Sequence, residues 1–224
     1  MLWKTALAPG DHTEQYTCYV VEHLQPPARM FASLACVMLL SKGEMATMII
    51  REATAADAEG IAHVHVASWH TTYTGIIPDD VIAQMSDPQR RLAQWQRFLA
   101  EEHPRESAFV AADDDGRIVG FARCTPTRSG AEDAAIYPGE LESIYLLQET
   151  QGRGVGRQLV RAVAARLAQQ GMQAMIVWVF VDNPARRFYE ALGGQFVREQ
   201  SFTIAGAELR EVAYGWRDTI VLLK

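Results

Sequence analysis

The segment with the clearest chemistry is a glycine-rich turn that joins an apolar strand to a helix, LESIYLLQETQGRGVG at residues 141–156. Gly152, Gly154 and Gly156 place no Cβ atom over the backbone, so a ligand can approach it closely. The first amides of a helix have no intrahelical acceptor, and the helix dipole adds positive charge there. The turn is therefore predicted to bind phosphate oxygens through backbone N–H groups.

Spacing excludes two familiar phosphate motifs. A P-loop has four residues between its glycines and then Gly-Lys-Ser/Thr, which this turn lacks. The dinucleotide fingerprint, counted from Gly154, requires a glycine where Leu159 stands. The order of the motifs is more specific: Gln151-x-x-Gly154-x-Gly156 follows a strand, and NPARRFYEALGG comes later, at residues 183–194.

This combination resembles the GNAT superfamily of acyl-CoA-dependent N-acetyltransferases, over roughly residues 48–217. The acyl-CoA site of that family carries a Q/R-x-x-G-x-G/A turn and, most often, an N-x-x-A-x-x-F-Y helix. Here Asp182 takes the usual asparagine position, one residue before Asn183. The resemblance implies acetyl-CoA as co-substrate and direct attack by a primary amine in a ternary complex, without a covalent acyl-enzyme.

The resemblance also implies how acetyl-CoA is bound. In the family, two parallel strands separate at their ends and the pantetheine arm enters between them; here these strands correspond to 140–147 and 174–181. The diphosphate binds to the glycine-rich turn, and no metal ion is required. The residues implied to bind the cofactor are Ile144, Tyr145, Leu146, Gln151, Gly152, Arg153, Gly154, Val155, Gly156, Arg157, Asn183, Ala185 and Tyr189. In the alternative interpretation, Arg153 and Arg157 are solvated arginines and Asn183 caps its helix.

Acetyl transfer requires a neutral amine, whereas a lysine-like amine is almost fully protonated at neutral pH. Glu140 and Glu142 share strand parity and point to one face, and Glu140 occupies the base position of the histone-acetyltransferase branch. We expect one of them to act as the base; the alternative is a rim carboxylate that attracts a cationic substrate. Tyr189 matches the family tyrosine that protonates the departing thiolate, or else it packs in the core.

The acceptor is expected to contact the helical region that carries SWHTTYTGIIP. Trp69, His70 and Tyr73 are the candidate substrate-binding residues, with burial in the core as the alternative. His63, His65 and His70 do not predict a metal site, because residues two apart diverge on a helix.

The elements that must position these residues alternate along the chain. Strands are predicted at 48–51, 107–112, 117–124, 140–147, 174–181, 195–202 and 209–217, the last two joined by a turn near Gly206. Helices are predicted at 55–73, 78–85 and 87–100, from the glycine-rich turn to Gly171, and from Asp182 or Asn183 to Gly193. The fold class is therefore α/β, with a GNAT-type mixed, mostly antiparallel sheet of about six to seven strands and helices on both faces. Strands 140–147 and 174–181 are expected to pair in parallel at the centre of the sheet, because a helix connects them. The resemblance implies that this pair is splayed for CoA.

The chain has 224 residues, 49% of them apolar, and a net charge of −6. This length and composition predict one domain and no general attraction to nucleic acid or to an anionic membrane. The strand-and-helix pattern that begins near Met48 places the domain at 45–224. Cys18, Cys36 and Cys124 form no CxxC pair, which favours a reducing cytoplasm. We interpret residues 1–44 as an extension that is disordered, loosely docked or not native, with translation starting at Met45 or Met48.

The leading hypothesis is an enzyme that acetylates a small-molecule amine. A protein amino group is the alternative acceptor, and a homodimer is left open. A different class of function is a non-catalytic acyl-CoA-binding sensor or interaction module, which would bind CoA tightly and release no thiol with any amine.

Overall fold

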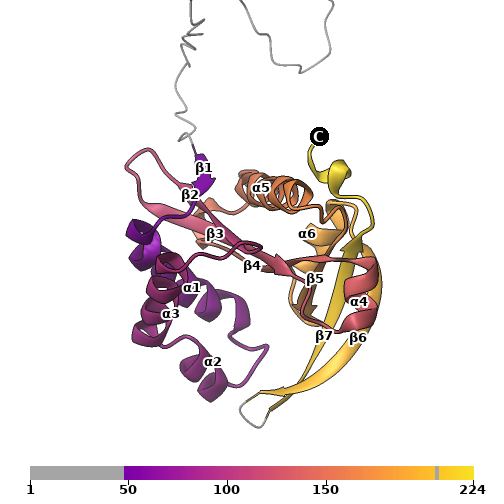
Figure 1. Ribbon diagram of the computed structural model, residues 1–224. Helices are drawn as coiled ribbons and strands as arrows, with labels where there is room; N and C mark the ends of the chain where they lie inside the picture. Colours follow the sequence, from indigo (N-terminus) through magenta and orange to yellow (C-terminus); the bar gives the residue numbers. More distant parts are fainter. Residues whose placement is uncertain (1–47, 205–206) are drawn as a thin grey trace, which may run out of the picture. The chain divides into compact units, whose positions relative to one another are not determined.

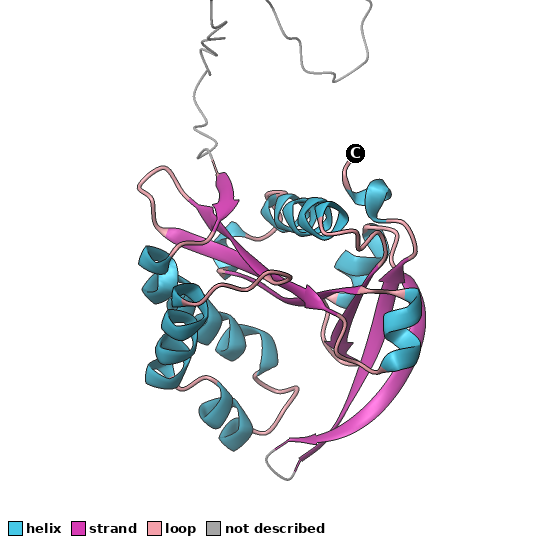
Figure 2. Cartoon of the chain, in the orientation of Figure 1, coloured by secondary structure: helices cyan, strands magenta, loops and turns pink. Residues whose placement is uncertain are grey.

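The computed structural model of the chain describes residues 48–204 and 207–224. In this part, a single mixed sheet carries α1, α2 and α3 on one face and α5 and α6 on the other (Figures 1 and 2). The predicted extension at 1–44 and the predicted turn near Gly206 lie outside the described residues.

The sheet has seven strands in the order β1-β2-β3-β4-β5-β7-β6. Their bounds are β1 (Ile49–Glu52), β2 (Ser107–Ala112), β3 (Ile118–Pro126), β4 (Gly139–Leu146), β5 (Met175–Phe180), β6 (Gln195–Ile204) and β7 (Ala207–Trp216). Only β4 and β5 pair in parallel, while every other neighbouring pair is antiparallel. The predicted fold class is confirmed, including the position of the parallel pair.

The helices that flank the sheet are α1 (Ala58–Tyr73), α2 (Asp79–Met85), α3 (Pro88–Ala100), α4 (Ala131–Ile136), α5 (Val155–Gln169) and α6 (Arg186–Ala191). Short 3-10 turns add η1 (Ala55–Asp57), η2 (Gln148–Thr150) and η3 (Thr219–Leu222). None of the helices between residues 48 and 224 has the length and apolar character needed to cross a bilayer.

Helix α5 connects the parallel strands and packs on the sheet. Its predicted apolar stripe is buried, and every member is at most 1% exposed: Val155, Leu159, Val160, Val163 and Leu167. Burying one such side chain stabilises the fold by about 1.5–3 kcal/mol. Gly139 is the first residue of β4 and lies beneath this helix. A Cβ atom at this position would clash with the helix, because it would lie 2.8 Å from a Leu167 methyl carbon. Gly171 follows the helix with φ of +80° and ends it as predicted.

The structure differs from the prediction in short elements. Helix α4 was not predicted, because six residues make less than two turns and carry no apolar stripe. Helix α6 begins at Arg186, later than predicted. The Asn183 Oδ1 atom accepts a hydrogen bond from the Ala185 amide at 2.8 Å, and this bond holds a turn that precedes the helix. The predicted helix at 55–73 opens with η1 as a 3-10 turn.

Candidate active site

The site forms where β4 and β5 part. Their parallel ladder contains only the pairs Gly139 with Met175 and Glu140 with Ile176. On its other edge, β4 has a bulge at Glu142, because Arg123 and Cys124 of β3 pair with the residues on either side of it. A cavity of about 930 Å³, the size of a small-molecule site, is lined by both strands beyond the last ladder pair.

The glycine-rich turn closes one end of this cavity. Gly152 and Gly154 have φ of +75° and +77°, and Gly154 is the N-cap of α5. Among the described residues, no carbonyl or side chain accepts a hydrogen bond from the amides of Gly152 to Arg157. Intrahelical bonding begins with the amide of Gln158, which donates to the Gly154 carbonyl at 3.2 Å. The amide of Gln151 donates to the Gln148 carbonyl at 3.2 Å. The donors left for an anion therefore begin at Gly152.

Close packing brings the two distant motifs together. A Cβ on Gly156 would lie 3.2 Å from the Cζ atom of Phe188, so glycine lets α5 meet the ring from α6. Asn183 is 6% exposed and lines the cavity beside Ala185. The turn and the NPARRFYEALGG segment consequently share one wall.

Tyr189 lies on this wall and is 5% exposed. Burial raises the pKa of its hydroxyl above the ordinary value, as does the neighbouring Tyr73, so it stays protonated at neutral pH. The hydroxyls of Tyr73 and Tyr145 lie 3.2 Å apart in the same cavity, and burial raises the pKa of each. The cavity therefore contains phenol groups that can donate a proton.

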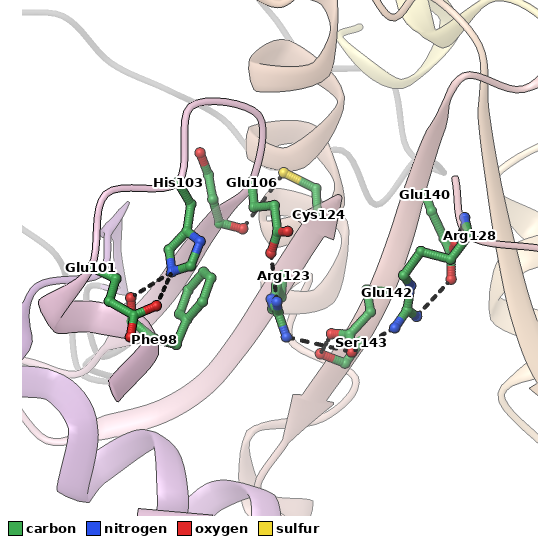
Figure 3. Close-up of polar contacts among 11 residues, drawn as sticks. Phe98, Glu101, His103, Glu106, Arg123, Cys124, Arg128, Glu140, Glu142 and Ser143 are labelled. Carbon is green, nitrogen blue, oxygen red and sulfur yellow. Dashed lines mark hydrogen bonds and ion pairs between the residues drawn. The ribbon is translucent and has the colours of Figure 1, made fainter. Parts of the chain in front are cut away.

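Glu140 and Glu142 both line the cavity, as their shared parity predicts, but both are engaged by arginines (Figure 3). Glu140 is 4% exposed, and its carboxylate accepts hydrogen bonds from the backbone amide and the Nη2 atom of Arg128, each at 2.9 Å. The Oε1 atom of Glu142 lies 3.6 Å from Arg128 Nη1 and 3.6 Å from Arg123 Nη1. Arg123 also donates to Glu106 at 2.5 Å. The result is a row of alternating charges beside the cavity.

Trp69 and Tyr73 reach the cavity from α1, whereas His70 does not line it. The Trp69 Nε1 atom is buried and finds no hydrogen-bond partner among the described residues. His70 is exposed, and its Nε2 atom lies 3.1 Å from the hydroxyl of Ser86. His65 accepts a hydrogen bond from Trp95 at 3.3 Å, and burial, with a smaller effect of Arg91, lowers its pKa to about 3.

Sequence reasoning missed Arg128, Gln200 and Glu211, all of which line the cavity. Glu211 of β7 lies opposite Phe180 of β5 and Gln200 of β6. Its carboxylate accepts a hydrogen bond from Gln200 Nε2 at 2.7 Å. Parity alone places Glu211 on one face of its strand with Ala213, but it does not show that this face meets the cavity, which depends on the sheet order.

Most of the predicted site residues therefore meet in one place. The cavity is lined by Trp69, Tyr73, Glu140, Glu142, Ile144, Tyr145, Leu146, Gln151, Gly152, Gly154, Gly156, Arg157, Asn183, Ala185 and Tyr189. His70, Arg153 and Val155 do not line it. The Arg153 side chain is exposed, and Val155 is 1% exposed in the core beneath the turn, where only its amide can serve a ligand.

The sequence of the chain matches the model of the acetyltransferase (GNAT) family over residues 66–194, which is more than half of its length. The chain belongs to the GNAT family. An N-acetyltransferase of Bacillus subtilis, YuaI, described as uncharacterized, is 42% identical over 173 residues, which cover 77% of this chain and 95% of the relative. These matches confirm the predicted family and the prediction that the protein is an enzyme.

Other GNAT proteins are more distant. Aminoglycoside N(6')-acetyltransferase type 1 of Stenotrophomonas maltophilia is 33% identical over 129 residues, covering 56% of this chain and 71% of the relative. The crystal structure of yncA from Salmonella typhimurium with its cofactor acetyl-CoA superposes with a TM-score of 0.55 at 23% identity, covering 76% of this chain and 93% of that one. That superposition confirms the GNAT fold.

Proposed function

We propose that this GNAT protein transfers the acetyl group of acetyl-CoA to a primary amine of a small molecule, by direct attack in a ternary complex. The observation that carries the proposal is the run of amides from Gly152 to Arg157, which have no acceptor among the described residues and lie at one end of a cavity whose other end is lined by carboxylates. An anion and a cationic acceptor can thus occupy one continuous space.

The residues present fit acetyl-CoA. The amides at the start of α5, which is 15 residues long, suit the diphosphate, and the exposed guanidinium of Arg157 adds a positive charge. The edge of β4 beyond Glu140 has no ladder partner on the β5 side, so its backbone groups near Ile144 and Leu146 are available to the amides of the pantetheine arm. When bound, acetyl-CoA supplies an acetyl thioester that an amine can attack. The cofactor named for yncA supports this assignment.

The acceptor end favours an amine. Glu140, Glu142 and Glu211 line it, and Arg128 is the basic residue among them. Trp69 offers a buried N–H donor and an apolar ring beside these carboxylates. A small, cationic acceptor with a carbon skeleton suits this lining, and the aminoglycoside named for the Stenotrophomonas maltophilia relative is a small molecule of that type.

Tyr189 is the proposed proton donor to the thiolate of CoA. The thiol of CoA has a pKa of about 8.5 if it behaves like a free cysteine, so the leaving group benefits from a proton.

Cys124 has a buried free thiol, which is in keeping with the cytoplasmic location that we propose. Burial raises the pKa of this thiol to about 11, which makes it an unsuitable nucleophile for a covalent acyl-enzyme.

The test is thiol release from acetyl-CoA across a panel of amines, with the acetylated product identified by mass spectrometry. The panel contains monoamines, diamines, amino acids, an aminoglycoside and a peptide with a free N-terminus, and a reaction without amine measures hydrolysis. We expect amine-dependent release with at least one small molecule. Tight CoA binding without release for any amine would identify a sensor instead, and release with the peptide alone would identify a protein acetyltransferase.

A further inference from the structure

The acceptor ammonium must lose a proton before its nitrogen can attack, and a base for this step needs an oxygen that is free to take it. Glu140 does not meet this requirement well, because both of its oxygens accept hydrogen bonds from Arg128 at 2.9 Å. Glu142 lies between the guanidinium groups of Arg123 and Arg128, and its second oxygen accepts from Ser143 at 2.9 Å. Each of these glutamates is thus already engaged by an arginine.

Glu211 is placed differently. Its side chain is half-buried in the cavity lining, and in the described part of the chain its carboxylate has one hydrogen-bond partner, the Gln200 amide at 2.7 Å from Oε1. The Gln200 amide is itself held by Arg198, whose Nη1 atom donates to Gln200 Oε1 at 2.6 Å, and Arg198 is anchored by Asp133 at 2.7 Å. This series of hydrogen bonds fixes one oxygen of Glu211 and leaves the other oxygen for a ligand.

The surroundings also favour proton uptake by Glu211. Burial raises its pKa above the ordinary glutamate value, and the charge of Glu140 on β4 acts in the same direction. The hydrogen bond from Gln200 and the charges of Arg198 and Arg128 oppose this shift without reversing it. A base with a raised pKa is better matched to a reaction at neutral pH than an ordinary carboxylate.

We propose that Glu211 accepts the proton of the acceptor ammonium, directly or through one water, while Glu140 and Glu142 remain paired with arginines and attract the cation. The inference rests on the proposed function. The ammonium N–H bond breaks and its proton passes to the free oxygen of Glu211. The nitrogen lone pair then forms the C–N bond to the acetyl carbon as the C–S bond breaks. Tyr189 gives its proton to the sulfur and is reprotonated by the second proton that the nitrogen loses, and Glu211 releases its proton to solvent.

The experiment compares wild type, Glu211→Gln and Glu208→Gln with the most active amine of the panel, as kcat/KM from pH 6 to pH 10. Glutamine retains an oxygen for the Gln200 amide, so the variant should fold, and thermal unfolding and CoA calorimetry verify this. Glu208 is an exposed residue of the same strand that does not line the cavity, which makes it a matched control.

We expect Glu211→Gln to lower kcat/KM by about 100-fold or more at pH 7, since general base catalysis typically contributes 10²–10⁴. The deficit should shrink by about tenfold for each pH unit, because a larger fraction of the amine is then neutral without help. Glu208→Gln should match wild type. A deficit that is constant with pH, or no deficit, would overturn the base role while leaving the acetyltransferase intact. Absence of release by wild type with every amine would overturn the proposed function and this role with it.

Discussion

Replacing Gly154 with alanine tests whether the backbone of the turn holds the diphosphate. Gly154 has φ of +77°, and a Cβ there meets no protein atom within 4 Å, so the substitution brings left-handed strain without a clash. Gly116, in the turn between β2 and β3, has φ of +80°, is equally open and does not line the cavity, which makes Gly116→Ala a matched control. Each variant should lose roughly 1–2 kcal/mol of folding free energy. For a domain of this size that is a fall in Tm of about 2–8 °C.

The two variants should differ in CoA binding. At Gly154 the strain is relieved by turning the neighbouring amides, or the new methyl group stands beside the ligand, and either effect removes at least one charge-assisted hydrogen bond. Such a bond contributes about 1.5–3 kcal/mol, which corresponds to a CoA affinity about 10- to 150-fold weaker. Calorimetry measures CoA affinity, and thermal unfolding measures stability. Equal CoA affinity in the two variants, with equal loss of Tm, would refute the role of the turn amides.

Further predictions concern the proton donor, the acid stability and the free thiol. Tyr189→Phe should lower kcat by about 100-fold and leave CoA affinity unchanged in calorimetry; unaltered turnover would remove the donor role. Arg51 donates to both oxygens of Asp57 at 2.7 Å and lowers the pKa of Asp57 from 3.8 to about 2, so this contact stabilises the fold above pH 4 and is lost as the pH falls toward 2. Asp57→Asn should thus unfold more easily by about 1–2 kcal/mol at pH 6 in urea titrations, and the difference from wild type should disappear near pH 2. In a variant with serine at Cys18 and Cys36, a thiol reagent at pH 8 should leave Cys124 unmodified until the protein unfolds, because this thiol is buried; rapid modification of the folded protein would contradict that burial.

The fold could largely be predicted because its long elements carry strong periodic patterns. The apolar stripe of α5 indicates a helix and its buried face, and the unbroken apolar run of β5 indicates a strand in the interior of the sheet. The helical connection between β4 and β5 then indicates their parallel direction. Short α4 and the late start of α6 could not be found in this way. Helix α4 is too short to show a period, and the start of α6 depends on the turn that the Asn183 side chain holds before it, which an apolar pattern does not reveal.

The candidate site was predictable where chemistry follows from local backbone or from parity. The amides of the turn and the shared face of Glu140 and Glu142 are of this kind. The arginine partners were not, because Arg128 lies in a loop whose path is set by tertiary contacts. Glu211 reaches the same cavity from a strand late in the chain, and only the sheet order brings it there.

The most direct test of the central claim is a crystal structure of the protein with acetyl-CoA. We predict diphosphate oxygens within about 2.7–3.2 Å of amide nitrogens between Gly152 and Arg157, with the pantetheine arm between β4 and β5. A diphosphate bound elsewhere, with these amides in contact with solvent alone, would contradict the account.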